Sequence, residues 1–201
     1  MGLFIVFEGG DASGKTTQAR LLADRLRSRG RDVVETFEPG ATQTGAAIRA
    51  LLLDGHEPID PTTEALLLAA DRALEVAEVI RPALGRGADV VSDRYVPSSL
   101  AYQGVGRGLG VEKMEKLNRW ATGGLEPDLV VVLDVDEAVA TSRLATPGDR
   151  LERAGAEFHA AVRDAYRTLA ADRGWIVLDG SADEEIVGAR VWEVVRERVG
   201  L

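Results

Sequence analysis

The sequence predicts an α/β fold in which a five-stranded parallel sheet is covered by helices on both faces. Short apolar, β-branched runs alternate with amphipathic stretches, and this alternation is typical of parallel sheets. The length of 201 residues suits one domain, and no repeat, low-complexity tract or Pro/Ser linker divides the chain. With 45% hydrophobic and 28% charged residues, the composition is that of a globular protein. We therefore expect a single domain over residues 1–201.

The strands are predicted where β-branched and aromatic residues cluster between turn-forming residues. They are Leu3–Phe7, Asp32–Thr36, Ala88–Ser92, Leu129–Leu133 and Trp175–Leu178.

Helical periodicity bounded by Gly, Pro, Asp or Ser fills the segments between these strands. We predict helices at Lys15–Arg29, Thr44–Leu53, Thr62–Leu84, Ser98–Tyr102, Val111–Thr122, Glu137–Leu144, Gly155–Asp172 and Asp183–Val199. Pro147 and Gly148 interrupt the pattern, so we expect residues 145–149 to form a mobile loop. Trp120 and Tyr166 are expected in the core, and His56 and His159 in structural positions, because the two histidines belong to no metal-binding pattern.

Composition and charge exclude several classes of protein. The chain has no cysteine, which excludes disulfides, thiol catalysis and Cys-based zinc sites and suits a cytoplasmic protein. A formal net charge of −9 disfavours a nucleic-acid polymer as partner but not a small phosphorylated ligand. No run approaches 18 uninterrupted apolar residues and no basic region precedes the first strand, so we expect neither a membrane span nor a signal peptide.

A phosphate-binding loop follows the first predicted strand and opens the first predicted helix. Its sequence satisfies G-x-x-x-x-G-K-[ST] with Gly9, Gly10, Asp11, Ala12, Ser13, Gly14, Lys15 and Thr16. Glycines let successive backbone N–H groups face phosphate oxygens, and the helix N-terminus adds a positive dipole end. Lys15 is expected to reach the β- and γ-phosphates and Thr16 to ligate Mg²⁺. We predict ATP binding along residues 8–17, including Thr17, in a P-loop NTPase three-layer sandwich.

The segment after the third strand distinguishes among P-loop proteins. It lacks the Asp-x-x-Gly that a GTPase needs there, and the chain lacks the guanine-reading Asn-Lys-x-Asp sequence. Residues 93–104 read DRYVPSSLAYQG. This segment closely resembles the D-R-[YH]-x-x-S-S-x-A-Y-Q-G signature of bacterial thymidylate kinases.

Four further motifs agree with this family in the same order. They are Phe7-Glu8-Gly9 with Asp11, Glu38-Pro39-Gly40 after the second strand, Ala70-Asp71-Arg72-Ala73, and Asp149-Arg150-Leu151-Glu152 followed by Phe158-His159. The resemblance spans nearly the whole chain. It implies a homodimeric kinase that transfers the γ-phosphoryl group of ATP to dTMP with Mg²⁺.

Phosphoryl transfer to a phosphate needs charge neutralisation more than it needs a base. The second pKa of a phosphate monoester is about 6, so the acceptor is largely dianionic at neutral pH. We therefore expect Asp93 to help position Mg²⁺ or water, although it also suits a carboxylate that caps Arg94 or a helix. Arg94 is expected to bridge the donor and acceptor phosphates, since its planar guanidinium has fixed donors.

The resemblance also implies a set of residues around dTMP. Asp11 would lie near the sugar 3′-hydroxyl and the metal, and Tyr102 would exclude a 2′-hydroxyl. Surface positions remain the alternative for Arg49, Arg72, Ser99 and Gln103. The whole expected set is Asp11, Glu38, Pro39, Arg49, Leu68, Arg72, Arg94, Ser99, Tyr102 and Gln103.

The predicted lid at about residues 143–153 should supply the remaining cations. We expect Arg150 first and Arg143 second to cover the γ-phosphate, with Arg153 as a further candidate or a solvated charge. Ala12 stands where one branch of the family has a catalytic Arg, which assigns that function to the lid.

Two departures from the family concern the base. Phe37 stands where Arg is usual, and Leu68 stands where a Phe often stacks on thymine. The resemblance also suggests a cis peptide at Glu38–Pro39. A kinase for another nucleoside monophosphate or for a nucleoside hydroxyl, with Glu38 or Asp93 as base, remains the nearest alternative. A regulatory nucleotide-binding protein is a more distant one.

Overall fold

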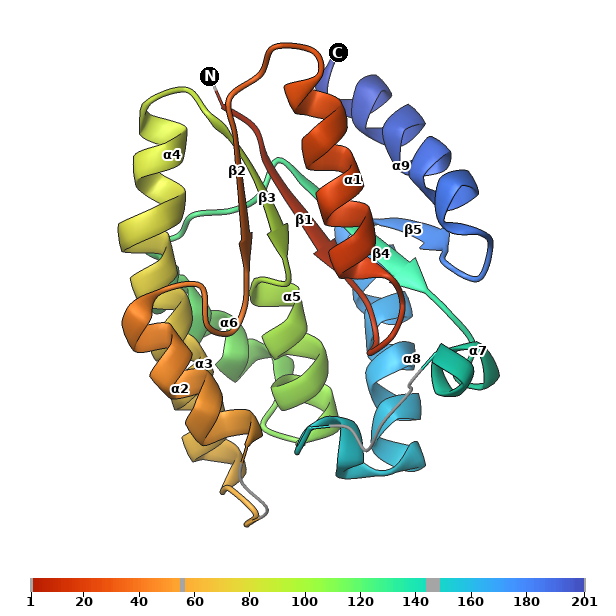
Figure 1. Ribbon diagram of the computed structural model, residues 1–201. Coiled ribbons are helices and arrows are strands. Elements are labelled where there is room, and N and C mark those ends of the chain that lie inside the picture. The colour runs from red at the N-terminus through yellow and green to blue at the C-terminus, as the bar shows by residue number, and fades with distance from the viewer. Residues whose placement is uncertain (1, 55–56, 144–148, 201) are drawn as a thin grey trace.

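The computed structural model, which describes residues 2–54, 57–143 and 149–200, contains one five-stranded parallel sheet in the order β2-β3-β1-β4-β5 (Figure 1). The predicted fold class is confirmed, and each predicted strand is present within about one residue of its expected bounds. The strands are β1 (Phe4–Glu8), β2 (Val33–Phe37), β3 (Asp89–Asp93), β4 (Leu129–Asp134) and β5 (Ile176–Asp179).

The strand order explains where a ligand can bind. Central β1 pairs with β3 on one side and β4 on the other, and Phe7 lies opposite Asp93. The loops after β1 and β3 therefore leave the same carboxyl edge side by side. Open parallel sheets bind ligands at this edge, where the strand order reverses.

Helices cover both faces of the sheet, because its strands are apolar on both sides. Ile5 and Phe7 of β1 face α1 (Lys15–Arg27) and α9 (Glu184–Val199), which lie together on the near face in Figure 1. Phe4 and Val6 point the other way, into a core formed with α3, α6 and α8. The bounds of the remaining α-helices are α2 (Gln43–Leu53), α3 (Pro61–Glu75), α4 (Arg81–Gly85), α5 (Val96–Ser99), α6 (Val111–Thr122), α7 (Glu137–Arg143) and α8 (Ala156–Arg173), with a 3₁₀ turn η3 at Glu152–Ala154.

Two predicted helices contain π-helical turns. The helix expected over residues 62–84 becomes α3, η1 (Val76–Ile80) and α4, with Arg81 N–H donating to the Val76 carbonyl. Pro82 follows directly, and its missing N–H favours such a break. The short helix expected over residues 98–102 extends as α5 and η2 (Leu100–Gly106). The π turn η2 contains the Tyr-Gln-Gly motif, consistent with the enrichment of π turns at functional sites, and η1 begins after the Ala-Asp-Arg-Ala motif of α3.

Some predictions about single residues and loops are confirmed and others are not. Tyr166 is buried as predicted. Trp120 on α6 is 82% exposed, so its predicted core position is wrong. His56 and residues 145–148 of the expected mobile loop lie outside the described residues. Among the helices that are described, none is long and apolar enough to span a bilayer.

Candidate active site

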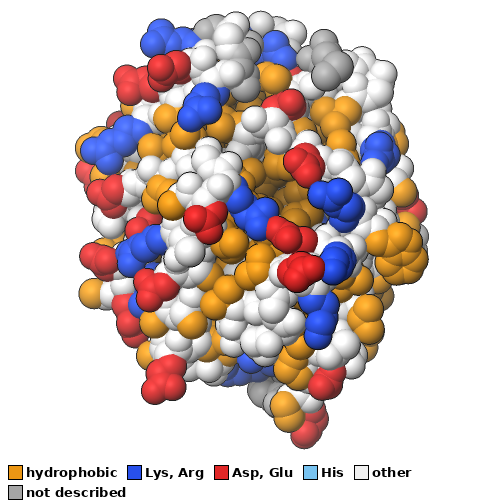
Figure 2. Space-filling view, turned by 180° about the vertical axis from the view of Figure 1, so that it is seen from behind, with side chains coloured by type: hydrophobic (Ala, Val, Ile, Leu, Met, Phe, Trp, Pro, Cys, Tyr) orange, Lys and Arg blue, Asp and Glu red, His pale blue; other side chains and the backbone are white. Residues whose placement is uncertain are grey.

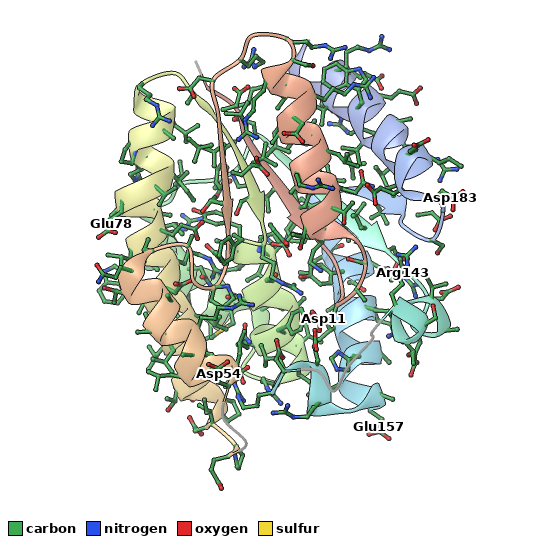
Figure 3. The ribbon with its side chains drawn as sticks, viewed as in Figure 1. Asp11, Asp54, Glu78, Arg143, Glu157 and Asp183 are labelled. Atoms are coloured by element: carbon green, nitrogen blue, oxygen red, sulfur yellow. The ribbon has the colours of Figure 1, made fainter. Side chains whose placement is uncertain are left out.

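A pocket of about 750 Å³ opens at the carboxyl edge of β1, β2 and β3. Helices α2, α3 and α5 with η2 form its other walls, and Figure 3 shows Asp11 in the loop between β1 and α1. Lys15, Thr16 and Asp93 line its phosphate-loop side. Every residue expected around dTMP lines the pocket: Asp11, Glu38, Pro39, Arg49, Leu68, Arg72, Arg94, Ser99, Tyr102 and Gln103. The structure thus brings together side chains from five separate segments of the chain.

The phosphate loop depends on backbone conformations that the motif supplies. Gly9 and Gly14 have φ of 134° and 94°, and a side chain at position 9 would place its Cβ 2.3 Å from the Leu133 carbonyl oxygen. Lys15 begins α1 and folds back so that Nζ donates to the Gly10 carbonyl at 2.6 Å. Burial, reinforced by Arg94, lowers the pKa of Lys15 to about 8. The ammonium group is therefore held where an anion would restore its pKa.

Thr16 and Asp93 form the part of the site that suits a metal ion. The Thr16 hydroxyl donates to Asp93 Oδ2, while Asp93 Oδ1 is buried without a hydrogen-bond partner among the described residues. Asp11 Oδ2 is unpartnered in the same way. Burying such oxygens costs free energy unless something binds them. Hydroxyl and carboxylate oxygens are ligands that Mg²⁺ accepts, so the residues present fit this ion.

Arg94 occupies a strained position between the phosphate loop and the rest of the pocket. Its φ is 77°, a conformation that costs about 1–3 kcal/mol for a residue with a side chain. The Arg94 N–H donates to Phe7 O at 2.9 Å, and its carbonyl accepts from Ser92 Oγ at 2.7 Å. Its guanidinium donates to Asp11 Oδ1 at 2.6 Å and to Ser98 Oγ at 3.0 Å. These contacts aim a largely buried cation across the mouth of the loop.

Glu8 helps to hold the segment after β3 that positions Arg94. The Phe7-Glu8-Gly9 motif contains this residue, but the sequence assigned it no function. Its buried carboxylate accepts from the backbone N–H groups of Tyr95 and Ser98 at 2.8 and 3.2 Å. The Ser98 and Tyr166 hydroxyls donate to the other oxygen at 2.7 and 2.8 Å. Burial raises the pKa of Glu8, although Arg94 and these donors oppose that shift. Ser98 and Tyr166 were not among the predicted site residues, and their link to Glu8 crosses too much sequence to be read from a motif.

Arg72 differs from its expected function as a direct contact to the nucleotide. It is 1% exposed, and its five N–H donors are all engaged by protein groups. Nε and Nη2 donate to the Glu38 carboxylate, with Nε 2.8 Å from Oε2. The remaining donors bind the Tyr95 carbonyl, Ser99 Oγ at 2.8 Å and Asn118 Oδ1. In the described conformation Arg72 therefore organises the pocket wall.

A second carboxyl group lies behind this ion pair. Burial, reinforced by Glu38, raises the pKa of Glu75 to about 10, so Glu75 keeps its proton at neutral pH. The Thr36 hydroxyl donates to it. Burial also raises the pKa of Glu38 to about 6 in spite of Arg72. The acceptor side of the pocket thus contains one guanidinium, one carboxylate and one neutral carboxyl group in close contact.

Arg49 is the exposed cation of the pocket. Its Nη1 donates to the Pro39 carbonyl at 2.7 Å, and its guanidinium carbon lies 5.9 Å from the centroid of the Phe37 ring. The Glu38–Pro39 peptide is cis, as predicted. The Gly40 N–H that follows donates to the Asp71 carboxylate at 3.1 Å and fixes the turn. Arg49 lines the pocket, and its remaining N–H donors make no hydrogen bond to the part of the chain that the structure describes.

The lid arginines do not lie as expected. Arg150 was expected over the γ-phosphate, but its Nε donates to the Leu52 carbonyl at 2.7 Å and its Nη2 to Glu64 at 2.9 Å. The buried carboxylate and the C-terminal carbonyl of α2 hold it on the acceptor side. Arg143 instead lies beside the phosphate loop and donates to the Gly180 carbonyl at 3.0 Å; Figure 3 shows it at the end of α7. Arg163, which no sequence motif singled out, packs near Gly10 and pairs with Glu137 at 3.1 Å.

Three features define a P-loop nucleotide kinase: a glycine-rich loop with its lysine, an adjoining basic pocket, and an Asp that accepts from a Thr hydroxyl while its other oxygen has no partner among the described residues. The family model "Thymidylate kinase" matches residues 7–191. A thymidylate kinase of Leifsonia xyli subsp. xyli is 51% identical, with 94% of this chain and 92% of the relative covered. One of Pelotomaculum thermopropionicum is 49% identical over 98% of this chain and 94% of the relative.

A solved structure agrees with these relatives. The crystal structure of thymidylate kinase from Ehrlichia chaffeensis has 31% identity and a TM-score of 0.79, covering 96% of this chain and 98% of that one. The chain belongs to the thymidylate kinase family. Its reaction is that of the family, phosphorylation of dTMP to dTDP with ATP as donor.

Proposed function

We propose that ATP binds with its triphosphate in the loop 8–17 and that dTMP fills the adjoining pocket. The γ-phosphoryl group then passes from ATP to dTMP in the space flanked by Lys15 and Arg94. The observation that carries this proposal is that the ATP half-site, the loop 8–17, and the dTMP half-site, the adjoining pocket, meet at one border, formed by Asp11. Asp11 belongs to the phosphate loop, contacts Arg94 at 2.6 Å and accepts from Tyr102 at 3.1 Å. A donor and an acceptor bound on either side of this border meet in line without a domain rearrangement.

The residues around the border would act through charge. Lys15 and Arg94 neutralise the phosphates that must approach each other, and removal of their repulsion is the main task in phosphoryl transfer. Arg49 reaches the acceptor phosphate with its free donors. We assign no general base, since the acceptor phosphate is largely dianionic at neutral pH. Arg143 and Arg163 are better placed than Arg150 to approach the ATP phosphates.

Thr16 and Asp93 are the residues that would hold Mg²⁺, with Asp11 facing the same space. Their support is the pair of unpartnered buried oxygens on the two aspartates. Magnesium held by these residues would offset the negative charge of the phosphates during transfer. The protein would contribute few ligands, because Mg²⁺ in kinases keeps waters and phosphate oxygens.

The active form would be a homodimer in the cytoplasm. Leu51 on α2, Leu66 on α3 and Trp120 on α6 are large apolar side chains that are 63%, 52% and 82% exposed. Helices α2 and α6 both pack on α3, so the three residues belong to helices that contact one another. An exposed apolar set of this kind suits a self-complementary interface. On the face that Figure 2 shows, positive and negative side chains are interspersed with hydrophobic ones, unlike the basic stripe of a polyanion-binding surface.

Coupled ADP release with dTMP, dUMP, dCMP, dGMP, AMP and thymidine tests the proposal. We expect the highest kcat/KM with dTMP, strict dependence on added magnesium, and ATP consumption only when an acceptor is present. Fastest turnover with thymidine would contradict a phosphate acceptor. Light scattering should give twice the chain mass, and a monomer would contradict the dimer alone.

A further inference from the structure

Glu64 is a buried carboxylate that no motif singled out. It lies in the first turn of α3, where Asp60 caps the helix through the N–H groups of Thr62 and Thr63 at 2.9 and 3.1 Å. Its side chain is 0% exposed and does not line the pocket. A carboxylate buried this deeply needs donors, and the donors it has come from two parts of the active site.

Two arginines and one glutamine share its two oxygens. Arg107 reaches Oε1 at 3.2 Å and Oε2 at 3.1 Å, and Arg150 reaches Oε2 at 2.9 Å. The side-chain Nε2 of Gln103 donates to Oε1 at 2.8 Å. Between two guanidinium groups Glu64 acts as an ionised acceptor, and an ionised carboxylate has no hydrogen to donate.

This fixes which end of the Gln103 amide is free. Gln103 is 1% exposed and lines the pocket. Because Glu64 takes the NH₂ end, the carbonyl Oε1 is the acceptor left for a ligand. A pyrimidine with an N–H at position 3, such as thymine, donates to that oxygen, whereas cytosine presents a lone pair at the same position and is repelled.

We infer that Glu64 is a specificity-determining positioning residue: it holds the Gln103 amide in the orientation that accepts the thymine imide N–H and rejects cytosine. The inference rests on the proposed binding of dTMP in this pocket. Arg107 and Arg150 also donate to Glu64, and Arg150 still holds Oε2 when Arg107 is removed. Arg150 also ties the segment after residue 148 to this carboxylate, so the lid and the base-recognising side chain share one support.

Glu64→Gln tests the inference because the substitution keeps size and shape while leaving a single oxygen. The charged guanidinium groups take that oxygen, and the new NH₂ group then faces Gln103, whose amide must turn. We expect the ratio of kcat/KM for dTMP to that for dCMP to fall about tenfold, mainly through opposite changes in the two KM values. Glu64→Asp, which still only accepts, should keep the ratio within about threefold of the wild type.

Two further variants separate this effect from general damage. Arg107→Ala removes charge from the cluster but leaves the bond between Glu64 and Gln103, so the ratio should persist. Glu112→Gln, an exposed change of the same chemistry on α6, should alter nothing. An unchanged ratio in Glu64→Gln, or an equal fall in Arg107→Ala, overturns the inference.

If Glu64→Gln does not fold, NMR of the wild-type protein with and without dTMP tests the inference instead. The Gln103 side-chain N–H that donates to Glu64 should keep its chemical shift when dTMP is added, because that hydrogen stays on Glu64, whereas the second N–H of the same amide is free to shift. A large shift of the N–H bound to Glu64 overturns the inference. A wild-type enzyme that prefers a nucleotide other than dTMP would instead contradict the proposed function, which is a distinguishable failure.

Discussion

The two halves of the pocket are built by different means. On the donor side, backbone conformation shapes the site: glycines form the loop, Arg94 is held at φ 77°, and Asp93 Oδ1 and Asp11 Oδ2 accept no hydrogen bond from the described residues. On the acceptor side, charged side chains are nearly all paired, with Arg72 on Glu38 and Arg107 and Arg150 on Glu64. Buried oxygens without a hydrogen-bond partner are available to bind a ligand, whereas paired charged side chains stabilise the wall of the pocket. We therefore expect donor-side substitutions to reduce catalysis and most acceptor-side ones to reduce stability.

Arg72→Met should have the largest effect and should act on stability. The change leaves Glu38 buried without its cation and Asn118 and Ser99 without their donor, and breaking a buried pair costs about 3–5 kcal/mol. Urea unfolding followed by circular dichroism measures the free energy of unfolding. Arg119→Met, an exposed change of the same kind on α6, should cost less than about 0.5 kcal/mol. A loss below about 1 kcal/mol for Arg72→Met would mean that the paired wall is not structural.

Lys15→Ala should show the opposite pattern. The substitution removes the cation that folds over the loop, and kcat should fall about 10²–10³-fold, as when one transition-state donor is lost. Unfolding free energy should change little or rise, because a buried ammonium with a lowered pKa is removed. Lys116→Ala on exposed α6 is the matched control. Turnover of dTMP within tenfold of the wild type would contradict the assignment of the donor half.

Glu75→Gln sharpens the comparison through pH. The folded pKa of Glu75 is raised from 4.5 to about 10, so its contribution to stability is present below pH 4.5 and is lost as pH rises toward 10. A neutral amide does not have this dependence. The advantage of Glu75→Gln over the wild type should therefore grow with pH between 5 and 8, by at most about 1.4 kcal/mol per pH unit. Parallel pH profiles of the two unfolding free energies would show that Glu75 is ionised in the folded protein.

The same contrast explains what the sequence could reveal. The phosphate loop was predictable because its function resides in consecutive residues, and the strands were predictable because both faces of the sheet are buried. The cluster at Glu64 was not, since Gln103 and Arg150 lie 39 and 86 residues away and only tertiary packing joins them. Arg150 was expected on the ATP side because a motif gives a residue type but not the direction of its side chain. Trp120 was misplaced for a related reason, since an apolar residue on a helix suits a core and an exposed interface equally.

Arg49 is an exception to the expectation that acceptor-side substitutions reduce stability, because it is an exposed cation whose remaining N–H donors have no partner among the described residues. Arg49→Ala should leave the free energy of unfolding within about 0.5 kcal/mol of the wild type, as for other exposed positions. The KM for dTMP should rise about tenfold, since a charge-assisted hydrogen bond to a phosphate contributes about 1.5–3 kcal/mol and part of it is replaced by water. Steady-state kinetics at saturating ATP measure this, with exposed Arg20→Ala on α1 as the matched control. If Arg49→Ala destabilised the fold and left KM unchanged, Arg49 would belong with the paired side chains of the pocket wall. Binding of the acceptor phosphate would then depend on Arg94, the remaining pocket-lining arginine with an unpaired N–H among the described residues.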